Sequence, residues 1–244
     1  MLAIDSSETV LTSDRLEKEA AKHFVHAILR PQDEIDLMDF ADTVRPEARE
    51  ALDGLRALLT EEHPFKTLVL DTMNGLERLC HEYVCQNTYK GDWGEKGFLG
   101  FQRGYDTSLQ DWRTLLNLLD RIRDERDMGT FALCHTQVKT QTNPLGPDYD
   151  RFIPAMHRKT WDLTHGWSDM CLFGSFEVEV DTQQSKSKTK GKGRGGSTRL
   201  LYTTYSAAWD AKNRHGLPEE IEVSSTSSKD AFEDFTTALI EARG

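Results

Sequence analysis

The chain has 244 residues, of which 37% are hydrophobic and 29% are charged, and its formal net charge is −11. This length suits one sizeable α/β domain and is short for two. The negative charge excludes a protein that is basic over its whole surface, but it leaves room for a local basic patch that contacts phosphates.

The N-terminal half predicts strands that alternate with helices. In chain order we expect a strand at 2–5, helices at 13–30 and 45–62, a strand at 66–71, helices at 75–88 and 108–126, and a strand at 129–135. A structured loop with five glycines and five aromatic residues is predicted at 89–106, where Trp93, Phe98 and Phe101 are expected to pack. Strands that alternate with helices favour crossover connections and a parallel sheet.

The C-terminal half predicts β structure around a basic insert. A polar connection at 138–160 and a helix near 161–167 precede two β-rich runs, 169–180 and 198–210, and a helix at 230–243 closes the chain. The insert, 182–198, has no apolar residue and is expected to be the flexible tip of a hairpin. The predicted fold is α/β: a single domain over 1–244, with a mostly parallel sheet flanked by helices and a C-terminal β-hairpin that extends one sheet edge.

The cysteines and the apolar runs favour a cytoplasmic protein without a membrane partner. The four cysteines include no CxxC pair, so we expect reduced thiols. Cys134 lies in an apolar run and is predicted to be a small buried residue. No apolar run approaches the roughly 20 residues that span a membrane, and the sequence does not open with a signal-peptide pattern.

The stretch TLVLDTMNGLERL, residues 67–79, places Asp71 at the end of a predicted buried strand. Open α/β sheets bind ligands at the carboxyl ends of their strands, so a carboxylate there is well placed to hold Mg²⁺ beside a phosphate. The alternative is that Asp71 caps the helix that follows.

Further polar residues lie at comparable positions. His135 or Gln137, just past the next strand, can contact a terminal phosphate. Lys212 and Arg214 are separated by one residue, so on an extended segment they project the same way and can meet a phosphate across a subunit boundary. Glu8 can orient or deprotonate an attacking water. The alternatives are a common strand-end histidine, a solvated basic turn and an exposed turn glutamate.

Taken in order, these features resemble the RecA-like ATPases of tailed phages, AAA-type nucleotide-binding proteins linked to single-strand annealing and recombination. The resemblance covers roughly residues 1–222 and includes TLVLDTMNGLERL, SLQDWRTLLNLLDRI, FALCHTQVK, WSDMCLF and AKNRHGLP, of which AKNRHGLP is the most specific. It implies a RecA-like P-loop NTPase core that binds ATP and Mg²⁺.

The resemblance also implies roles for these residues. Asp71 would hold Mg²⁺ through water with support from Thr72, and His135 would contact the γ-phosphate, with Gln137 close to the nucleotide. Lys212 and Arg214 would reach the nucleotide of a neighbouring protomer, which implies a homo-oligomer.

Glu8 would correspond to the glutamate that activates water in this family. The family usually spaces its acids as Asp-x-Glu, whereas this chain has Asp5-Ser6-Ser7-Glu8, so the match is imperfect.

The family's phosphate-binding loop, GxxxxGK[ST], does not occur in the sequence. The glycine- and lysine-rich run KGKGRGGST lacks a hydroxyl residue after its GK pair. If residues 2–5 are the second core strand, the first strand, the loop and the first helix would precede Met1, and we expect an N-terminally incomplete core. The alternative is a degenerate paralogue that does not hydrolyse ATP.

Two segments predict contact with single-stranded DNA. The insert carries basic residues among serines and glycines, which favours salt-sensitive, nonspecific binding or, as the alternative, a solvated tip without a partner. The connection at 138–160 interleaves cations with aromatic residues, as a single-strand channel does. The candidate residues are Lys139, Arg151, Arg158, Lys159, Lys186, Lys188, Lys190, Lys192 and Arg194.

The predicted function is ATP-dependent binding of single-stranded DNA in recombination or annealing, in a phage or a bacterium. One alternative is a nucleotide-independent DNA-binding or scaffold protein. Another is an ATPase that acts on a protein partner, as helicase loaders do. Whether this chain hydrolyses ATP is left open by the missing loop.

Overall fold

The computed structural model describes residues 24–28, 54–185 and 188–243, with the backbone alone for 24–28 and 178–195. Two compact units form this mixed α/β protein. Among the described residues, the α/β unit comprises 24–28, 54–137 and 154–168, and the β unit comprises 138–153, 169–185 and 188–243. The predicted strand at 2–5, together with Glu8, lies outside the described residues.

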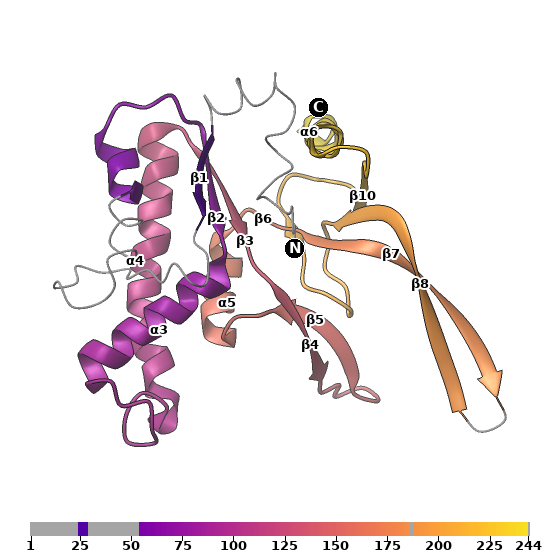
Figure 1. Cartoon of the computed structure of the whole chain (residues 1–244), viewed down its shortest axis with the longest axis horizontal. Coiled ribbons are helices and arrows are strands. Elements are labelled where there is room, and N and C mark those ends of the chain that lie inside the picture. The colour runs from indigo at the N-terminus through magenta and orange to yellow at the C-terminus, as the bar shows by residue number, and fades with distance from the viewer. Residues whose placement is uncertain (1–23, 29–53, 186–187, 244) are drawn as a thin grey trace. The chain divides into compact units, whose positions relative to one another are not determined.

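A parallel sheet of three strands forms the centre of the α/β unit (Figure 1). Its strands are β1 (Phe24–Ile28), β2 (Thr67–Asp71) and β3 (Gly129–Leu133), in the order β1-β2-β3. Leu68 and Leu70 of β2 are fully buried, as expected for a central strand with residues alternating between the two faces. The predicted parallel pairing is confirmed for these strands.

Helices α3 (Met73–Tyr89), α4 (Arg103–Arg126) and α5 (Arg158–Trp167) belong to the same unit, and residues 54–60 are also helical. Each of α3 and α4 buries one apolar stripe, as the periodicity predicts. On α4 the buried stripe is Trp112, Leu115, Leu116, Leu119 and Ile122. The indole N–H of Trp112 donates to Thr164 Oγ1 at 2.8 Å and so joins α4 to α5.

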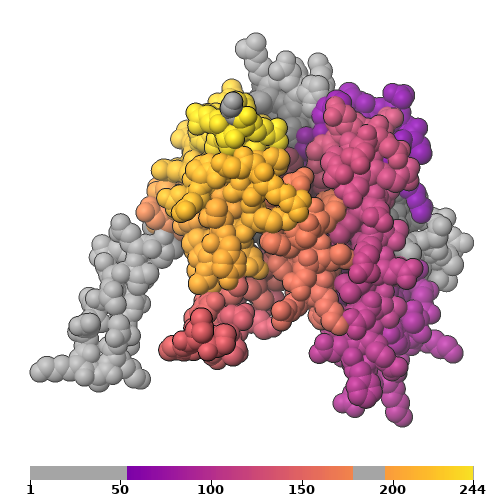
Figure 2. Space-filling view, turned by 180° about the vertical axis from the view of Figure 1, so that it is seen from behind, coloured from indigo at the N-terminus to yellow at the C-terminus, as the bar shows by residue number. Residues whose placement is uncertain are grey.

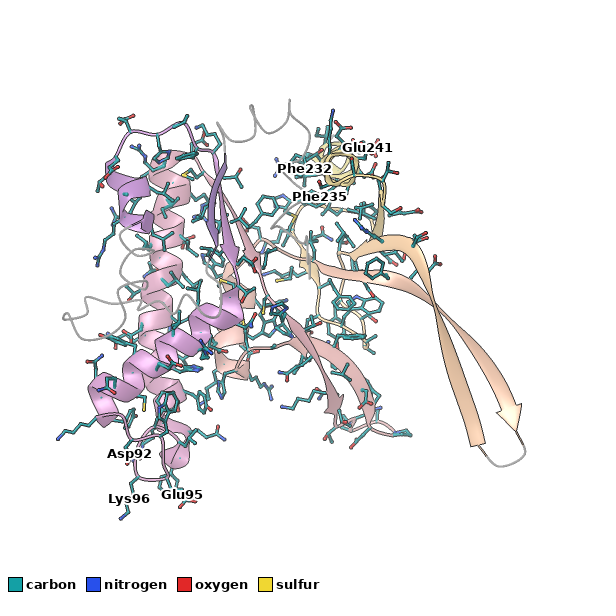
Figure 3. The ribbon with its side chains drawn as sticks, in the orientation of Figure 1. Asp92, Glu95, Lys96, Phe232, Phe235 and Glu241 are labelled. Atoms are coloured by element: carbon teal, nitrogen blue, oxygen red, sulfur yellow. The ribbon has the colours of Figure 1, made fainter. Side chains whose placement is uncertain are left out.

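The loop between α3 and α4, which contains Asp92, Glu95 and Lys96 (Figure 3), folds tightly around the fully buried Phe98. An added Cβ on Gly97 would approach the Asp92 carbonyl oxygen to 1.9 Å, so only glycine fits there. Phe98 packs as predicted. The prediction for Phe101 is wrong, because this side chain is 94% exposed on a left-handed backbone with φ of 50°.

The β unit contains a three-stranded antiparallel sheet, with short strands beside it. From residue 169 onward its elements are β6 (Met170–Cys171), β7 (Phe173–Ser185), β8 (Lys188–Tyr202), β9 (Lys212–Asn213), β10 (Glu220–Val223) and α6 (Ser228–Arg243). The sheet order is β10-β8-β7, and β6 pairs with β9.

Each face of this sheet is covered by a different cluster. Helix α6, the yellow segment in Figure 2, buries Phe235 against Leu201 and Ile221, while Phe232 on the same helix is 47% exposed (Figure 3). Because neighbouring residues of a strand face opposite sides, Tyr202 lies on the other face. There it stacks on Trp209, with ring centroids 4.1 Å apart.

Three predictions of local structure are wrong in the described residues. The helix predicted over 13–30 contains β1, because pairing with β2 in the parallel sheet outweighs the local pattern. The polar connection at 138–160 contains β4 (Thr136–Gln141) and β5 (Tyr149–Pro154), which pair with each other. The β7–β8 hairpin is present, but it pairs with β10 and does not extend the parallel sheet.

No disulfide joins the four cysteines, all of which lie in the described ranges, and Cys134 is buried as predicted. Burial raises the pKa of the Cys134 thiol to about 12, which leaves it inert at neutral pH. Within the described ranges, no helix has both the length and the apolar character needed to cross a membrane.

Gly104→Ala tests the packing around Phe98. The new Cβ would meet the buried Phe98 ring at 2.3 Å, so we expect the free energy of unfolding to fall by about 1–3 kcal/mol in urea titrations. Gly166→Ala in α5, where no atom lies within 4 Å of the added Cβ, is the matched control. Its free energy of unfolding should rise by up to about 1 kcal/mol, because alanine favours a helix more than glycine does. Similar unfolding midpoints for the two variants would contradict this account.

Candidate functional site

The carboxyl ends of β1, β2 and β3 meet at one edge of the parallel sheet. Asp71, the last residue of β2, lies opposite Ile28 of β1 and Leu133 of β3 in the register. His135 follows Leu133 by two residues, so it also belongs to this edge. The structure therefore brings together Asp71, Thr72 and His135, three of the predicted site residues.

Thr72, and not Asp71, caps the helix that follows β2. The Gly75 N–H donates to Thr72 Oγ1 at 3.3 Å, and Thr72 has the extended backbone of an N-cap residue. Thr72 is only 5% exposed, and its peptide bond with Asp71 is cis. The half-buried carboxylate of Asp71 is thus not used as the cap, which removes the alternative role that the sequence allowed.

The backbone of His135 is fixed on both sides. Its N–H donates to Asn74 Oδ1 in the first turn of α3 at 3.0 Å, and its carbonyl accepts from the Ala155 N–H at 2.8 Å. The His135 side chain itself is exposed. Gln137, the alternative contact, lies in β4 and approaches the Pro154 carbonyl at 3.5 Å. His135 is therefore a rigidly held residue at the same sheet edge as Asp71.

Glu77, one turn further along α3, is buried at 6% exposure and anchors the start of α5. Both of its carboxyl oxygens lie 2.9 Å from the His157 nitrogen, which donates its N–H to them. Burial raises the pKa of Glu77 to about 7, although hydrogen bonds from Thr160 and His157 favour the charged form. A carboxyl with this pKa gains or loses its proton near neutrality.

Histidine and tyrosine rings enclose this carboxyl group. The His157 ring stacks on Tyr105 with centroids 4.0 Å apart, and His81 Nε2 lies 3.9 Å from Glu77 Oε1. Burial, with a contribution from His157, lowers the pKa of His81 to about 4. At neutral pH His81 is therefore uncharged.

Sequence reasoning did not identify Glu77 as special. The available signal was its position within the apolar stripe of α3, where Met73, Leu76 and Cys80 are also buried. A carboxylate on a buried helix stripe requires a partner inside the protein.

The residues present fit a magnesium–phosphate site only in part. Among the described residues, no group of three or more His, Cys, Asp or Glu side chains is arranged to hold a metal. Mg²⁺ next to phosphates commonly takes one or two carboxylates, with water and phosphate oxygens supplying the rest, and Asp71 suits that role. A GxxxxGK[ST] loop that would cradle the phosphates is not in the sequence.

Lys212 and Arg214 lie together in the β unit, on and just after β9. Lys212 is directly opposite Cys171 of β6, and Arg214 Nη1 is 3.0 Å from Asp169 Oδ1. Burial lowers the pKa of Lys212, and the neighbouring charge of Arg214 lowers it further. These two charges are therefore close enough to interact, and Lys212 is partly buried, unlike a residue of a freely solvated turn.

The predicted nucleic-acid residues of 138–160 divide between the two units. Lys139 is exposed on β4 of the β unit, whereas Arg158 and Lys159 lie in the first turn of α5 in the α/β unit. Lys159 pairs with Asp106, and Arg158 Nε lies 3.8 Å from Asp162 Oδ2.

Arg151 differs from these residues because its side chain is only 10% exposed. Its guanidinium donates to Asp210 Oδ1 at 2.6 Å and to the Ser206 carbonyl at 3.4 Å, and it lies 5.1 Å from the centre of the Tyr205 ring. The guanidinium therefore fixes β5 to the segment before β9, and a phosphate could reach it only if this pair opened.

The basic insert lies largely in β8. Lys188, Lys190, Lys192 and Arg194 have strand backbone paired with β7. Lys186, like Glu8, lies outside the described residues.

Comparison with known proteins gives one match. A family model described as an AAA domain matches residues 12–215, which is most of the chain. No curated protein and no solved structure matches this chain.

Glu77→Gln tests the buried carboxyl. The raised pKa of Glu77 means that its contribution to stability is complete below pH 4.5 and is lost as the pH rises through about 7. His81 acts oppositely, because its pKa falls from 6.5 to about 4, so its contribution is lost as the pH falls between those values. Glutamine stays neutral at every pH. As the pH rises from 5 to 8, the free energy of unfolding of the variant should therefore increase by on the order of 2 kcal/mol relative to that of wild type.

Urea unfolding at several pH values measures this difference. Glu82→Gln, on the same helix but with a side chain that is 36% exposed, is the matched control and should show no such trend. A constant difference between Glu77→Gln and wild type across the range would refute the assignment.

Arg151→Ala tests whether this guanidinium is structural. Removing it takes away the guanidinium that pairs with Asp210 at a largely buried position, so we expect a loss of roughly 3 kcal/mol in the free energy of unfolding. Lys139→Ala, at an exposed position, should change stability by less than about 0.5 kcal/mol. Adding Asp210→Asn to Arg151→Ala should restore part of the loss, and additive losses would argue against the pair.

Proposed function

Because the chain belongs to the AAA-domain family, we propose that it is a RecA-like protein that binds ATP and Mg²⁺ and, in an ATP-dependent way, binds single-stranded DNA for recombination or annealing. Family membership makes it a nucleotide-binding, ATPase-like protein. The RecA-like core, the DNA partner and the recombination role are parts of the proposal.

The observation that supports the nucleotide site best is Asp71 at the carboxyl end of β2. Its carboxylate is not the helix cap, since Thr72 has that role, and it lies at the same edge as His135. In this proposal Asp71 holds Mg²⁺ through water, and Thr72 keeps the turn after β2 in place. When bound, Mg²⁺ would neutralise charge on the phosphate oxygens.

His135 is suited to contact the terminal phosphate. Its backbone is held by Asn74 and Ala155, so its exposed ring starts from a fixed point. Such fixation lowers the entropy that is lost when a ligand binds. Gln137, the alternative contact, follows on β4.

The positions of Lys212 and Arg214 support a homo-oligomer as the active form. They lie in the β unit, and Arg214 pairs with Asp169 where both side chains are more than half exposed. An exposed pair is worth at most about 1 kcal/mol, so a phosphate can replace Asp169 at small cost. We propose that both cations contact a nucleotide held by a neighbouring protomer.

The DNA partner is supported by exposed cations on both units. Lys139 and Arg158 are exposed, and the segment 188–194 of β8 carries basic residues at four alternate positions. Phosphate contacts of this kind give salt-dependent binding without sequence preference. Arg151 is left out of this surface because of its pair with Asp210.

Asp71→Asn tests the nucleotide site. The variant keeps the size of the side chain but loses the charge, so we expect the affinity for MgATP, measured by calorimetry, to fall at least about tenfold, or about 1.4 kcal/mol. Affinity for ATP without Mg²⁺ should change little. Asp127→Asn, beyond the C-terminus of α4 and next to the opposite end of β3, is the matched control. Absence of MgATP binding by wild type, or equal affinity in Asp71→Asn, would overturn the nucleotide site.

Fluorescence anisotropy of a labelled oligo-dT, with and without MgATP, tests the coupling. Tighter binding with MgATP is expected. Equal binding in both conditions would instead favour a nucleotide-independent DNA-binding protein.

A further inference from the structure

The β7–β8 ribbon continues well beyond the part of β8 that pairs with β10 (Figure 1). Strand β10 pairs with β8 only over Arg199–Tyr202, whereas the pairing of β7 with β8 continues to Ser185 opposite Lys188. The basic segment of β8 is therefore paired with β7 alone.

The four basic residues in the distal segment 188–194 of β8 share one face of this ribbon. They occupy positions 188, 190, 192 and 194, and residues two apart on a strand lie on the same side. Their backbone positions are spaced by about 7 Å. The intervening residues, Thr189, Gly191, Gly193 and Gly195, belong to the other face.

The register divides this face into two halves of different charge. Residues directly opposite each other in an antiparallel pair share a face. Near the sheet, Glu179 is opposite Arg194 and Asp181 is opposite Lys192. Further out, the neutral residues Gln183 and Ser185 are opposite Lys190 and Lys188.

We propose that the distal half, at Lys188 and Lys190, is the part of the ribbon that binds the phosphate backbone of single-stranded DNA, while the negative charges at positions 179 and 181 offset the positive charges at 192 and 194, which lie opposite them in the register. This inference rests on the proposed function and deepens it. From composition alone the basic residues of the insert are equivalent, whereas the register makes them unequal.

Charge and composition both favour a backbone contact. Opposed acid–base positions give little net field to an approaching polyanion, whereas two cations opposite neutral residues give a net positive charge. No aromatic residue occurs between 177 and 201, so the ribbon offers no stacking surface for bases. Binding should therefore depend on salt and not on base sequence.

Two variants with the same change in charge test the inference in the full-length chain. The distal variant is Lys188→Gln with Lys190→Gln, and the proximal variant is Lys192→Gln with Arg194→Gln. Affinity for labelled oligo-dT is measured by anisotropy at several salt concentrations. The distal variant should reduce the slope of log K against log salt by about 1.4, which corresponds to two single-strand phosphate contacts. The proximal variant should reduce this slope by less than half of that amount.

Removal of the opposed acids is the complementary variant. Glu179→Gln with Asp181→Gln should strengthen binding and steepen the salt dependence, because the charges of Lys192 and Arg194 are then no longer offset by acids at the opposed positions. Equal losses of affinity in the distal and proximal variants, or no gain in affinity on removing the acids, would overturn the inference about the ribbon. The proposed function would still stand in that case, provided that the wild-type chain binds oligo-dT.

The remaining outcomes are also decisive. Binding that does not depend on MgATP would count against the proposed function. The variants would still test whether the distal half of the ribbon contacts DNA. Absence of oligo-dT binding by wild type would overturn both. An equal or stronger effect of the distal variant on duplex DNA would overturn the choice of single strands.

Discussion

The site region of the α/β unit depends on three side chains at the start of α3 whose oxygens accept backbone N–H groups. Thr72 accepts from Gly75, Asn74 from His135, and Glu77 from His157. A buried N–H without an acceptor costs free energy comparable to a lost hydrogen bond, so these contacts decide where the chain can run after β2, after β3 and into α5. Asp71 is not needed as the helix cap because Thr72 satisfies the first of these donors.

The same arrangement explains why a carboxyl group is tolerated in the interior. Glu77 receives the N–H of the residue that precedes α5, where the helix dipole also favours negative charge. Desolvation nevertheless raises its pKa to about 7, so the charged carboxylate, which is the stronger acceptor for this N–H, predominates only above that pH. The segment that leaves after His135 and returns before His157 is consequently held at both ends by one helix, α3.

Sequence patterns predicted the elements whose signal is local and failed where pairing partners decide. Leu68 and Leu70 alternate along β2, and α4 carries a long apolar stripe, so both were predictable. The apolar residues Phe24 and Ile28 are spaced four apart, which suits a helix, yet they belong to a strand paired with β2. Strand β4 is exposed along its whole length and has no alternating pattern, so no local signal marks it. The strand-end position of Asp71 was predictable, whereas the partners of Glu77 are distant in sequence and were not.

Two arginine–aspartate pairs in this protein differ in how deeply they are buried. The Arg151 and Asp210 side chains are 10% and 23% exposed, whereas those of Arg214 and Asp169 are 53% and 56% exposed. Opening the first pair would leave a largely buried charge without compensation, which costs several kcal/mol. Opening the second exchanges one weak, solvated contact for another, so a phosphate oxygen can compete with Asp169 for Arg214. The availability of an arginine to a ligand therefore follows from the desolvation of its existing partner, which the sequence does not display and the structure does.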